Sequence, residues 1–381
     1  MAFNFFKKGE NKKKKSKTRE WVDSIVFAVV AATLIRWMFM EAFVIPTSSM
    51  ESSLLVGDYL FVSKVHYGTR TPQTPLQLPL THQRIPVLGI QSYLDWIKLP
   101  QYRLPGFGKV ERNDVVVFNV PTKELNDNID YPVDLKTFYV KRCLALPGDE
   151  IKIEDKKVFI NGERGEDPEN VQFTYLVYSQ YPLNREELRE FKISESYYLR
   201  KEKNLHVQLM HLNKKQAADL KKLSIVKNVA EASSNGEKGF KPYAKGERGD
   251  GIFPQNAKLF SWNNDWFGPL KVPQKGETIK VNLENLALYG DIIKLYDHNK
   301  DVRVEKNKLF IDGQEVKEYT FKQDYYFMVG DNRHNSLDSR YWGFVPEDHV
   351  VGKAAFTWFS LDPHGGFLDK VRWHKIFRPI N

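Results

Sequence analysis

The chain has 381 residues, of which 41% are hydrophobic and 13% aromatic, so it has room for more than one domain with a substantial core. Its net charge of +9 is concentrated in residues 1–20, which carry eight Lys or Arg against two Glu and leave only +3 for the rest. This excludes a broad basic face, so no nucleic-acid partner is expected. The single cysteine, Cys143, excludes an intramolecular disulfide, and the histidines lack metal-site spacing, so neither a metal nor another cofactor is expected.

The segment after the basic tail is predicted to cross a membrane once. Residues 24–35 are uncharged and mostly apolar, and the apolar character continues beyond Arg36 to Ile45. As a helix, residues 21–43 would be about 35 Å long, enough for a hydrocarbon core of about 30 Å. Arg36 lies towards one end, where it can snorkel outward, or pair with Glu41 if the helix end loosens.

A cleavable signal peptide is the alternative for this segment, because a basic start and a short apolar stretch also fit one. The apolar residues beyond Arg36 and the lack of a small-x-small site disfavour that alternative. No later segment is long enough for a second span. The lysines predict a cytoplasmic N-terminus, with everything after Phe43 on the extracytoplasmic side of the inner or plasma membrane.

Beyond the span the chain is predicted to be mostly β. Alternating apolar and polar residues indicate strands within residues 59–68, 114–121, 138–162 and 348–360. The proline-rich residues 71–108 between the first two strands favour an ordered excursion, because they hold apolar side chains that could be buried. These side chains are Leu88, Ile90, Tyr93, Leu94, Trp96 and Ile97.

One internal repeat is visible: residues 150–163 and 301–314 align without gaps and share a Phe-Ile-x-Gly. Each copy predicts a β-hairpin with a polar turn, at 154–157 and at 305–308. Between the copies, residues 184–191 and 213–232 have helical spacing, and residues 233–251 form a polar Gly/Lys loop.

Three stretches are candidates for chemistry: "IPTSSM" outside the membrane, "YVKR" in an apolar strand, and "GDNRHNSLDSRYWGFVP" near the end. Taken singly, a serine in a turn is usually a turn or cap residue, and a strand lysine usually faces solvent. Together they resemble the type I signal peptidases, membrane-bound serine proteases that remove signal peptides from exported proteins. The resemblance extends to "LLVGDYLFVSK", "RNDVVVF" and "VPEDHVVGKA", and to the order of these boxes.

The resemblance implies a Ser-Lys dyad, with Ser49 as nucleophile and Lys141 as general base. Burial in an apolar strand would lower the pKa of Lys141 from about 10.4, so that a neutral amine can take the serine proton. Thr47 aligns with the hydroxyl residue of the family's oxyanion hole, beside the backbone N–H of Ser49. Ser336 matches a serine that orients the lysine, whereas His334 is not expected to be a catalytic base.

The resemblance also implies support pairs and substrate pockets. Asp331 would pair with Arg142, and Asp338 with Arg340. The family binds the segment before the cut as an added β-strand, with shallow apolar pockets that favour small-x-small sites. The matching positions are Phe43, Ile45, Leu54, Tyr139 and Val140. The implied partners are exported preproteins, membrane lipid and a secretion translocase nearby.

These inferences give a signal-peptidase-like β-sheet or barrel domain with an inserted α+β region. The predicted divisions are a basic cytoplasmic tail (1–20), a transmembrane helix (21–43), a catalytic β domain in two parts (44–163 and 321–381) and the insertion (164–320). Two alternatives are less favoured. A soluble self-cleaving Ser-Lys protease of the repressor type is disfavoured by the membrane span. A membrane-tethered, non-catalytic binding protein for exported chains has no need for Ser49, Lys141 and Ser336 together.

Overall fold

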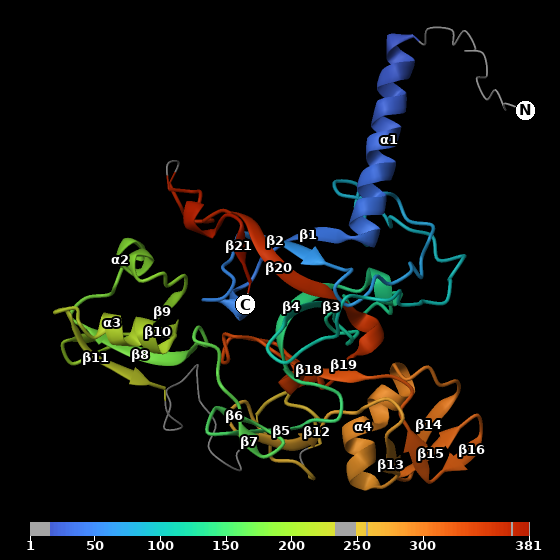
Figure 1. Ribbon diagram of the computed structural model, residues 1–381. Coiled ribbons are helices and arrows are strands. Elements are labelled where there is room, and N and C mark those ends of the chain that lie inside the picture. Colours follow the sequence, from blue (N-terminus) through green and yellow to red (C-terminus); the bar gives the residue numbers. More distant parts are fainter. Residues whose placement is uncertain (1–15, 233–248, 257, 367–368, 381) are drawn as a thin grey trace, which may run out of the picture.

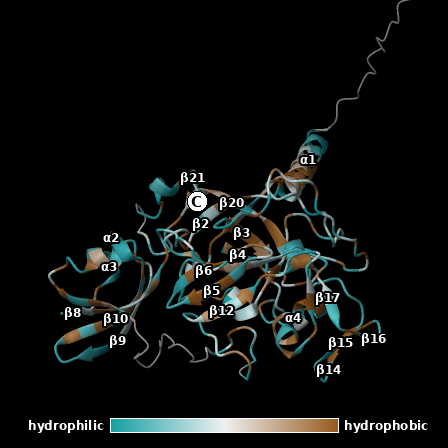
Figure 2. Ribbon diagram, turned by 60° about the horizontal axis from the view of Figure 1, so that its bottom comes forward, coloured by the Kyte–Doolittle hydropathy of each residue, from teal (hydrophilic) through white to brown (hydrophobic). Residues whose placement is uncertain are grey.

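The apolar segment near the N-terminus forms helix α1 (Lys17–Met38), which projects from the rest of the molecule (Figure 1). The structure, a computed structural model, describes residues 16–232, 249–256, 258–366 and 369–380. None of the residues of α1 is buried, and it is the one helix in these ranges that is long and apolar enough to span a membrane. In Figure 2 its hydrophobic colouring begins below a hydrophilic N-terminal end.

The helix ends earlier than the predicted residue 43: residues Met40–Val44 form strand β1, antiparallel to β2 (Asp58–Ser63). The helix ends early because of Glu41. Its carboxylate accepts a hydrogen bond from Arg36 Nε at 2.6 Å and forms an ion pair with Lys64 Nζ at 2.7 Å. Continuing the helix would remove this carboxylate from Lys64, which lies just beyond β2. The predicted pairing of Arg36 with Glu41 is confirmed. Of the predicted tail, residues 1–15 lie outside the described ranges and Lys17 already belongs to α1.

The central sheet confirms the mostly β fold and curves as a half-barrel. Its strands pair antiparallel in the order β1, β2, β20, β3, β4, β18, β19, and β21 pairs with β20. The remaining bounds are β3 (Val115–Asn119), β4 (Phe138–Ala145), β18 (Tyr325–Val329), β19 (Val345–Pro346), β20 (Val350–Ser360) and β21 (Arg378–Pro379). These positions confirm the strands predicted within 59–68, 114–121 and 348–360.

A second sheet packs beside the first, in the order β12 (Phe267–Lys271), β5 (Glu150–Glu154), β6 (Lys157–Ile160) and β7 (Glu163–Arg164). Both predicted hairpins are confirmed, as β5–β6 and as β14 (Val302–Glu305) with β15 (Lys308–Ile311), which also pairs β16 (Gln314–Val316). Helix α4 (Leu283–Leu295), β13 (Thr278–Lys280) and β17 (Glu318–Thr320) complete this part, which shares one apolar core with β18.

A third sheet has its own core and stands apart from the other two in Figure 1. Its order is β11 (Val226–Glu231), β8 (Phe173–Ser179), β10 (Leu205–Leu212) and β9 (Ser196–Glu202), and helices α2 (Arg185–Glu190) and α3 (Lys214–Leu220) belong to it. We call residues 172–231 the docking unit. The prediction of a helix over 213–232 is wrong in its second half. The β-branched Val226 and Val229 pair with β8, where such residues pack well.

The described part of the predicted insertion therefore packs as two bodies, the docking unit and the segment from β12 to β17. Residues 233–248 of the predicted polar loop lie outside the described residues. The domain boundaries set at 163 and 320 stay a prediction.

The proline-rich excursion, residues 71–108, contains no strand beyond isolated pairs such as Gln77 with Tyr93. The expectation that its apolar side chains are buried is met only by Tyr93. The other five, Leu88, Ile90, Leu94, Trp96 and Ile97, are exposed. Six prolines prevent a regular ladder, so the segment lacks a sheet or helix face that could cover these side chains.

The C-terminal segment is tied to the central sheet by one buried carboxylate. Asp58, at the start of β2, is fully buried and accepts hydrogen bonds from Lys375 Nζ at 2.5 Å and Ser360 Oγ at 2.6 Å. The backbone N–H of Leu55 donates to the same carboxylate at 2.8 Å. Asp58 thus holds β2, β20 and the chain end together.

We expect Asp58→Asn to lower the free energy of unfolding by about 3 kcal/mol, because it leaves the Lys375 ammonium buried without its counter-charge. Urea unfolding of the detergent-solubilised chain measures this loss. Asp301→Asn, which breaks an exposed pair with Arg303, is the control and should leave the midpoint unchanged. Equal midpoints for both variants would contradict the role of Asp58.

Candidate active site

Ser49 lies in a single 3-10 turn, Ser48–Met50, directly after β1. Pro46 favours an extended chain before the turn, and Thr47 is extended at φ −130° and ψ 158°. Met50 is fully buried below the turn, and the backbone N–H of Leu54 donates to its carbonyl oxygen at 2.7 Å. The buried methionine fixes the turn, so Ser49 remains only partly covered.

Lys141 lies in β4 with its amine against Ser49. The distance between Lys141 Nζ and Ser49 Oγ is 2.7 Å, and Nζ also donates to the Val140 carbonyl oxygen at 3.0 Å. The lysine is only 3% exposed. Burial lowers the pKa of its ammonium to about 8, although the negative charges of Asp338 and Asp331 act to raise it. A neutral amine is therefore accessible near neutral pH, within reach of a hydroxyl proton.

The next residue, Arg142, points to the opposite side of β4, as strand geometry requires. Its Nε donates to Asp331 Oδ1 at 2.8 Å and its Nη2 to Asp331 Oδ2 at 2.7 Å. Ser53 Oγ donates to the same carboxylate at 2.6 Å. The structure thus brings together the first expected support pair, and this pair connects the loop after Ser49 with the loop after β18.

The second expected pair is also brought together. Arg340 donates through Nε and Nη2 to the two oxygens of Asp338, at 2.9 and 2.8 Å. Burial alone would raise the pKa of Asp338, but the charge and hydrogen bonds of Arg340 lower it. The Gly330 N–H donates to Asp338 at 3.1 Å, so the pair fixes the backbone next to the dyad.

Ser336 is nearly buried on the same loop. Its proximity to the dyad is visible at Gly330: a Cβ there would lie 2.3 Å from Ser336 Oγ and 2.6 Å from the Ser49 carbonyl oxygen. Among the described contacts, Lys141 Nζ bonds to Ser49 and Val140, and Ser336 is not one of its partners. The orienting role of Ser336 stays a prediction.

A cavity of about 530 Å³ opens beside the dyad. Of the predicted pocket residues, Phe43, Ile45, Tyr139 and Val140 line it. Leu54 does not: it is fully buried in the core beneath the site, with Met50 and Leu60. The chain turns inward after Met50, so a leucine five positions beyond Ser49 packs below the cavity.

Thr47 also lines the cavity, is exposed, and makes no capping hydrogen bond, so its hydroxyl is available on the side of Ser49. Sequence reasoning missed other lining residues, among them Leu60, Val117, Asn335 and Leu337. Leu60 and Val117 reach the cavity only because β2 and β3 are brought close through β20, which no local pattern reveals. Asn335 and Leu337 flank Ser336, so their nearness in sequence was the available signal.

The docking unit contacts both loops that carry the candidate residues. Gln172 pairs its backbone with the loop after β18, through Gln172 N to the Asp331 carbonyl oxygen at 2.9 Å and Arg333 N to the Gln172 carbonyl oxygen at 3.0 Å. Its side chain donates to Ser52 Oγ at 2.8 Å. Glu51 accepts a hydrogen bond from Ser194, and burial raises the pKa of this carboxyl to about 7. The unit therefore braces the residues that follow Ser49.

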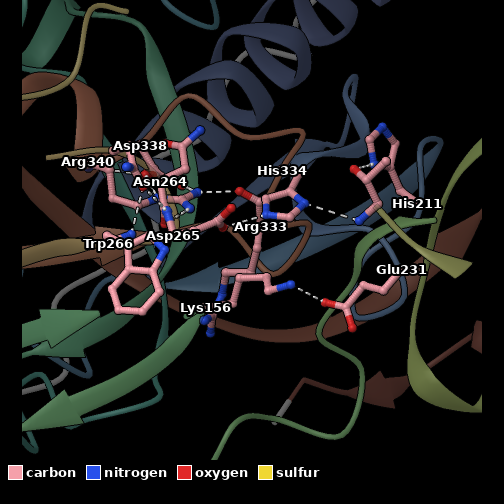
Figure 3. Close-up of polar contacts among 12 residues, drawn as sticks. Lys156, His211, Glu231, Asn264, Asp265, Trp266, Arg333, His334, Asp338 and Arg340 are labelled. Atoms are coloured by element: carbon pink, nitrogen blue, oxygen red, sulfur yellow. Dashed lines mark hydrogen bonds and ion pairs between the residues drawn. The ribbon is translucent and has the colours of Figure 1, made fainter. Parts of the chain in front are cut away.

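His334 supplies a further brace (Figure 3). The Thr174 N–H donates to His334 Nδ1 at 3.2 Å, so the proton lies on Nε2, which faces Asp265 Oδ1 at 2.7 Å. Thr174 Oγ1 lies 3.0 Å from His211 Nδ1, and burial lowers the pKa of His211 to about 4. With both ring nitrogens engaged, His334 joins the docking unit and the segment before β12 to the loop after β18.

No group of three His, Cys, Asp or Glu side chains able to hold a metal ion occurs within the described ranges. The arrangement consists instead of a hydroxyl, a buried amine and a cavity that can accept an extended chain. A hydroxyl beside a buried amine is the arrangement that a serine hydrolase with a lysine base requires.

Comparison with known proteins identifies the class. The family model for signal peptidase, peptidase S26, matches residues 18–229 and 271–359. Signal peptidase I of Buchnera aphidicola (Schizaphis graminum strain) is 28% identical over 329 residues, 86% of this chain and 71% of the relative. Signal peptidase I of Helicobacter pylori strain 26695 is 24% identical over 381 residues, 94% and 91% of the two chains. That of Rickettsia massiliae is 32% identical over 151 residues, 39% and 45% of the two chains.

The chain therefore belongs to the signal peptidase family, peptidase S26. It is a membrane serine endopeptidase, a hydrolase that removes signal peptides from preproteins. The family and helix α1 make it a single-pass membrane protein.

We expect Gly330→Ala to reduce kcat/KM about 100-fold, because the added Cβ displaces Ser336 and the Ser49 backbone from the lysine. Cleavage of a preprotein in detergent measures this effect. Gly290→Ala in α4, where a Cβ meets nothing within 4 Å, is the matched control and should retain full activity. Wild-type activity of Gly330→Ala would show that the dyad tolerates a shifted loop.

Proposed function

We propose that this chain cleaves preproteins after small-x-small sites through a dyad of Ser49 and Lys141. The observation that carries the proposal is the 2.7 Å separation between Ser49 Oγ and an amine that is almost fully buried. The neighbouring cation, Arg142, faces a carboxylate instead. The hydrogen-bond partners of the Lys141 amine are a hydroxyl and a carbonyl oxygen, and neither carries a negative charge that would favour the protonated amine.

In the proposed mechanism the neutral Lys141 amine takes the Ser49 proton as Oγ attacks the scissile carbonyl carbon. The resulting ammonium then gives this proton to the leaving amine, which departs as the new N-terminus of the mature protein. A water molecule, deprotonated by the same amine, attacks the acyl-Ser49 ester and releases the signal peptide. Lys141 thus acts as base and then acid in each half of the reaction.

The oxyanion of each tetrahedral intermediate is proposed to lie between the Ser49 N–H and the Thr47 hydroxyl. Support comes from the position of Thr47 on the cavity, where its side chain makes no capping bond. Phe43, Ile45, Tyr139 and Val140 are proposed to contact the residues before the cut. The exposed edge of β1 is free for strand addition, because β1 is the first strand of its sheet.

The orientation proposed is a cytoplasmic N-terminus and an extracytoplasmic catalytic body. The lysines before α1 support it through the positive-inside rule. Preproteins would then reach the site as they leave a secretion translocase nearby, with their cleavage site at the level of β1, directly after α1.

Ser49→Ala and Lys141→Met should each abolish cleavage of a preprotein with an alanine-x-alanine site, by at least about 1,000-fold in kcat. Lys141→Met keeps the length and burial of the side chain but removes the base, so the fold is retained. Purified variants in detergent, assayed by gel shift and mass spectrometry of the product, provide the measurement. Unchanged cleavage in either variant would refute the dyad.

The pH dependence follows from the lowered pKa of Lys141. Below a pH of about 8 the amine is protonated and cannot accept the serine proton. We therefore expect kcat/KM to fall about tenfold for each pH unit below this value and to be constant above it. The nearby carboxyl of Glu51, with a pKa of about 7, also titrates in this range. The control is therefore Glu51→Gln, in which the fall in kcat/KM should still begin near pH 8. A flat profile between about pH 6 and 10 would contradict a titrating lysine.

A further inference from the structure

The excursion, residues 71–108, carries a concentration of exposed apolar side chains. Thirteen of the thirty-five large hydrophobic residues exposed in the described chain lie in it. Patches of this size on a water-facing surface mark an interaction site. The members are Leu76, Leu78, Leu80, Val87, Leu88, Ile90, Leu94, Trp96, Ile97, Leu99, Tyr102, Leu104 and Phe107.

The charges of the same segment fit a lipid surface. It contains a single carboxylate, Asp95, which pairs with Lys98 at 3.4 Å, and one further exposed cation, Arg84, whereas Arg103 points inward to the carbonyl oxygens of Glu347 and Val350. Trp96 is 81% exposed, and aromatic residues of this kind are enriched at membrane–water interfaces. A surface that is apolar, aromatic and weakly basic matches the boundary between headgroups and acyl chains.

The excursion also lies against the membrane-spanning helix. Directly before the excursion, Trp37 Nε1 donates to the Arg70 carbonyl oxygen at 3.0 Å, and Thr69 Oγ1 donates to that of Met38 at 2.5 Å, so the excursion starts at the end of α1. A cavity of about 330 Å³ lies between the two, and its lining includes Thr33 and Leu34 on α1 and residues 71, 72, 74, 75 and 77–82 on the excursion. In Figure 1 the excursion lies beside the lower end of α1.

Thr33 lies five residues before the end of α1, about 7.5 Å along the helix axis. Excursion residues that share a cavity with it therefore extend beside the helix to about the depth at which interfacial elements insert, 5–10 Å. Their backbone is irregular but internally bonded, for example from Leu78 N to the Ser92 carbonyl oxygen at 2.9 Å and from Leu94 N to that of Leu76 at 2.8 Å. Irregular backbone facing lipid cannot enter the hydrocarbon core, which limits the segment to the interface.

We propose that residues 71–108 dock on the lipid bilayer beside α1, in the leaflet at the C-terminal end of that helix. The argument for lipid as the occupant is continuity: the apolar surface of α1, which spans the membrane, continues into that of the excursion. A second copy of the chain or a partner protein would need to occupy space next to α1 that lipid already fills. The docked excursion holds the catalytic body at one height above the bilayer.

A fluorescent thiol label tests the proposal in the full-length chain. Leu88→Cys and Trp96→Cys place a nitrobenzoxadiazole label on the surface, and the matched control is Val304→Cys, an exposed position on β14 far from α1 in Figure 1. The native Cys143 is fully buried and does not react in the folded protein. In phosphatidylcholine vesicles, the labels at 88 and 96 should shift to shorter emission wavelengths and be quenched by shallow doxyl-lipids, unlike the label at 304.

Quenching of all three labels by aqueous iodide, with no doxyl quenching at 88 or 96, would overturn the proposal. So would a wavelength shift that disappears when the protein is diluted into more lipid, because that marks a second copy as the occupant. Neither fluorescence readout depends on catalysis, so failure here is distinct from failure of the dyad.

Replacing Val87, Leu88 and Trp96 together by Ser should raise KM several-fold for a vesicle-embedded preprotein and leave cleavage of a short soluble peptide unchanged.

Discussion

The central constraint of this structure is that two adjacent residues of one buried strand are both basic. Strand geometry sends Lys141 and Arg142 to opposite sides of β4. Arg142 meets a carboxylate in bidentate contact. Lys141 meets a hydroxyl and a carbonyl oxygen, so burial acts on it without a directly bonded counterion. The difference between the two environments selects one cation as a structural anchor and leaves the other able to lose its proton.

Both loops of the site are held by contacts that are distant in sequence. The Arg142–Asp331 pair fastens the loop after Ser49 to the loop after β18, and Gln172 fastens both to the docking unit. His334 extends these contacts to Asp265, close to β12. The segments inserted between the two halves of the central sheet thus support the loops that carry Ser49 and Ser336, although none of their described residues lines the cavity.

Much of this arrangement was predictable from the sequence. Strong alternation located the strands of the central sheet, and the internal repeat located two hairpins. The resemblance to signal peptidases supplied the candidate residues. The remaining features depend on contacts between residues distant in sequence. The helix ends early because Glu41 pairs with Lys64, and Val226 lies in a strand paired with β8 although its neighbours have helical spacing. Leu54 faces the core because the chain turns after Met50, and no pattern within a few residues encodes that direction.

The short strand β1 also determines how far the protease reaches. Phe43, on the cavity wall, lies five positions after the end of α1, within the paired strand β1, which the contacts of Glu41 hold in place. Ser49, the proposed nucleophile, is therefore held at a fixed height relative to the membrane helix. Preproteins with equally suitable cleavage sites are therefore distinguished by the distance between their own apolar segment and the scissile bond. This selection needs no recognition of side chains.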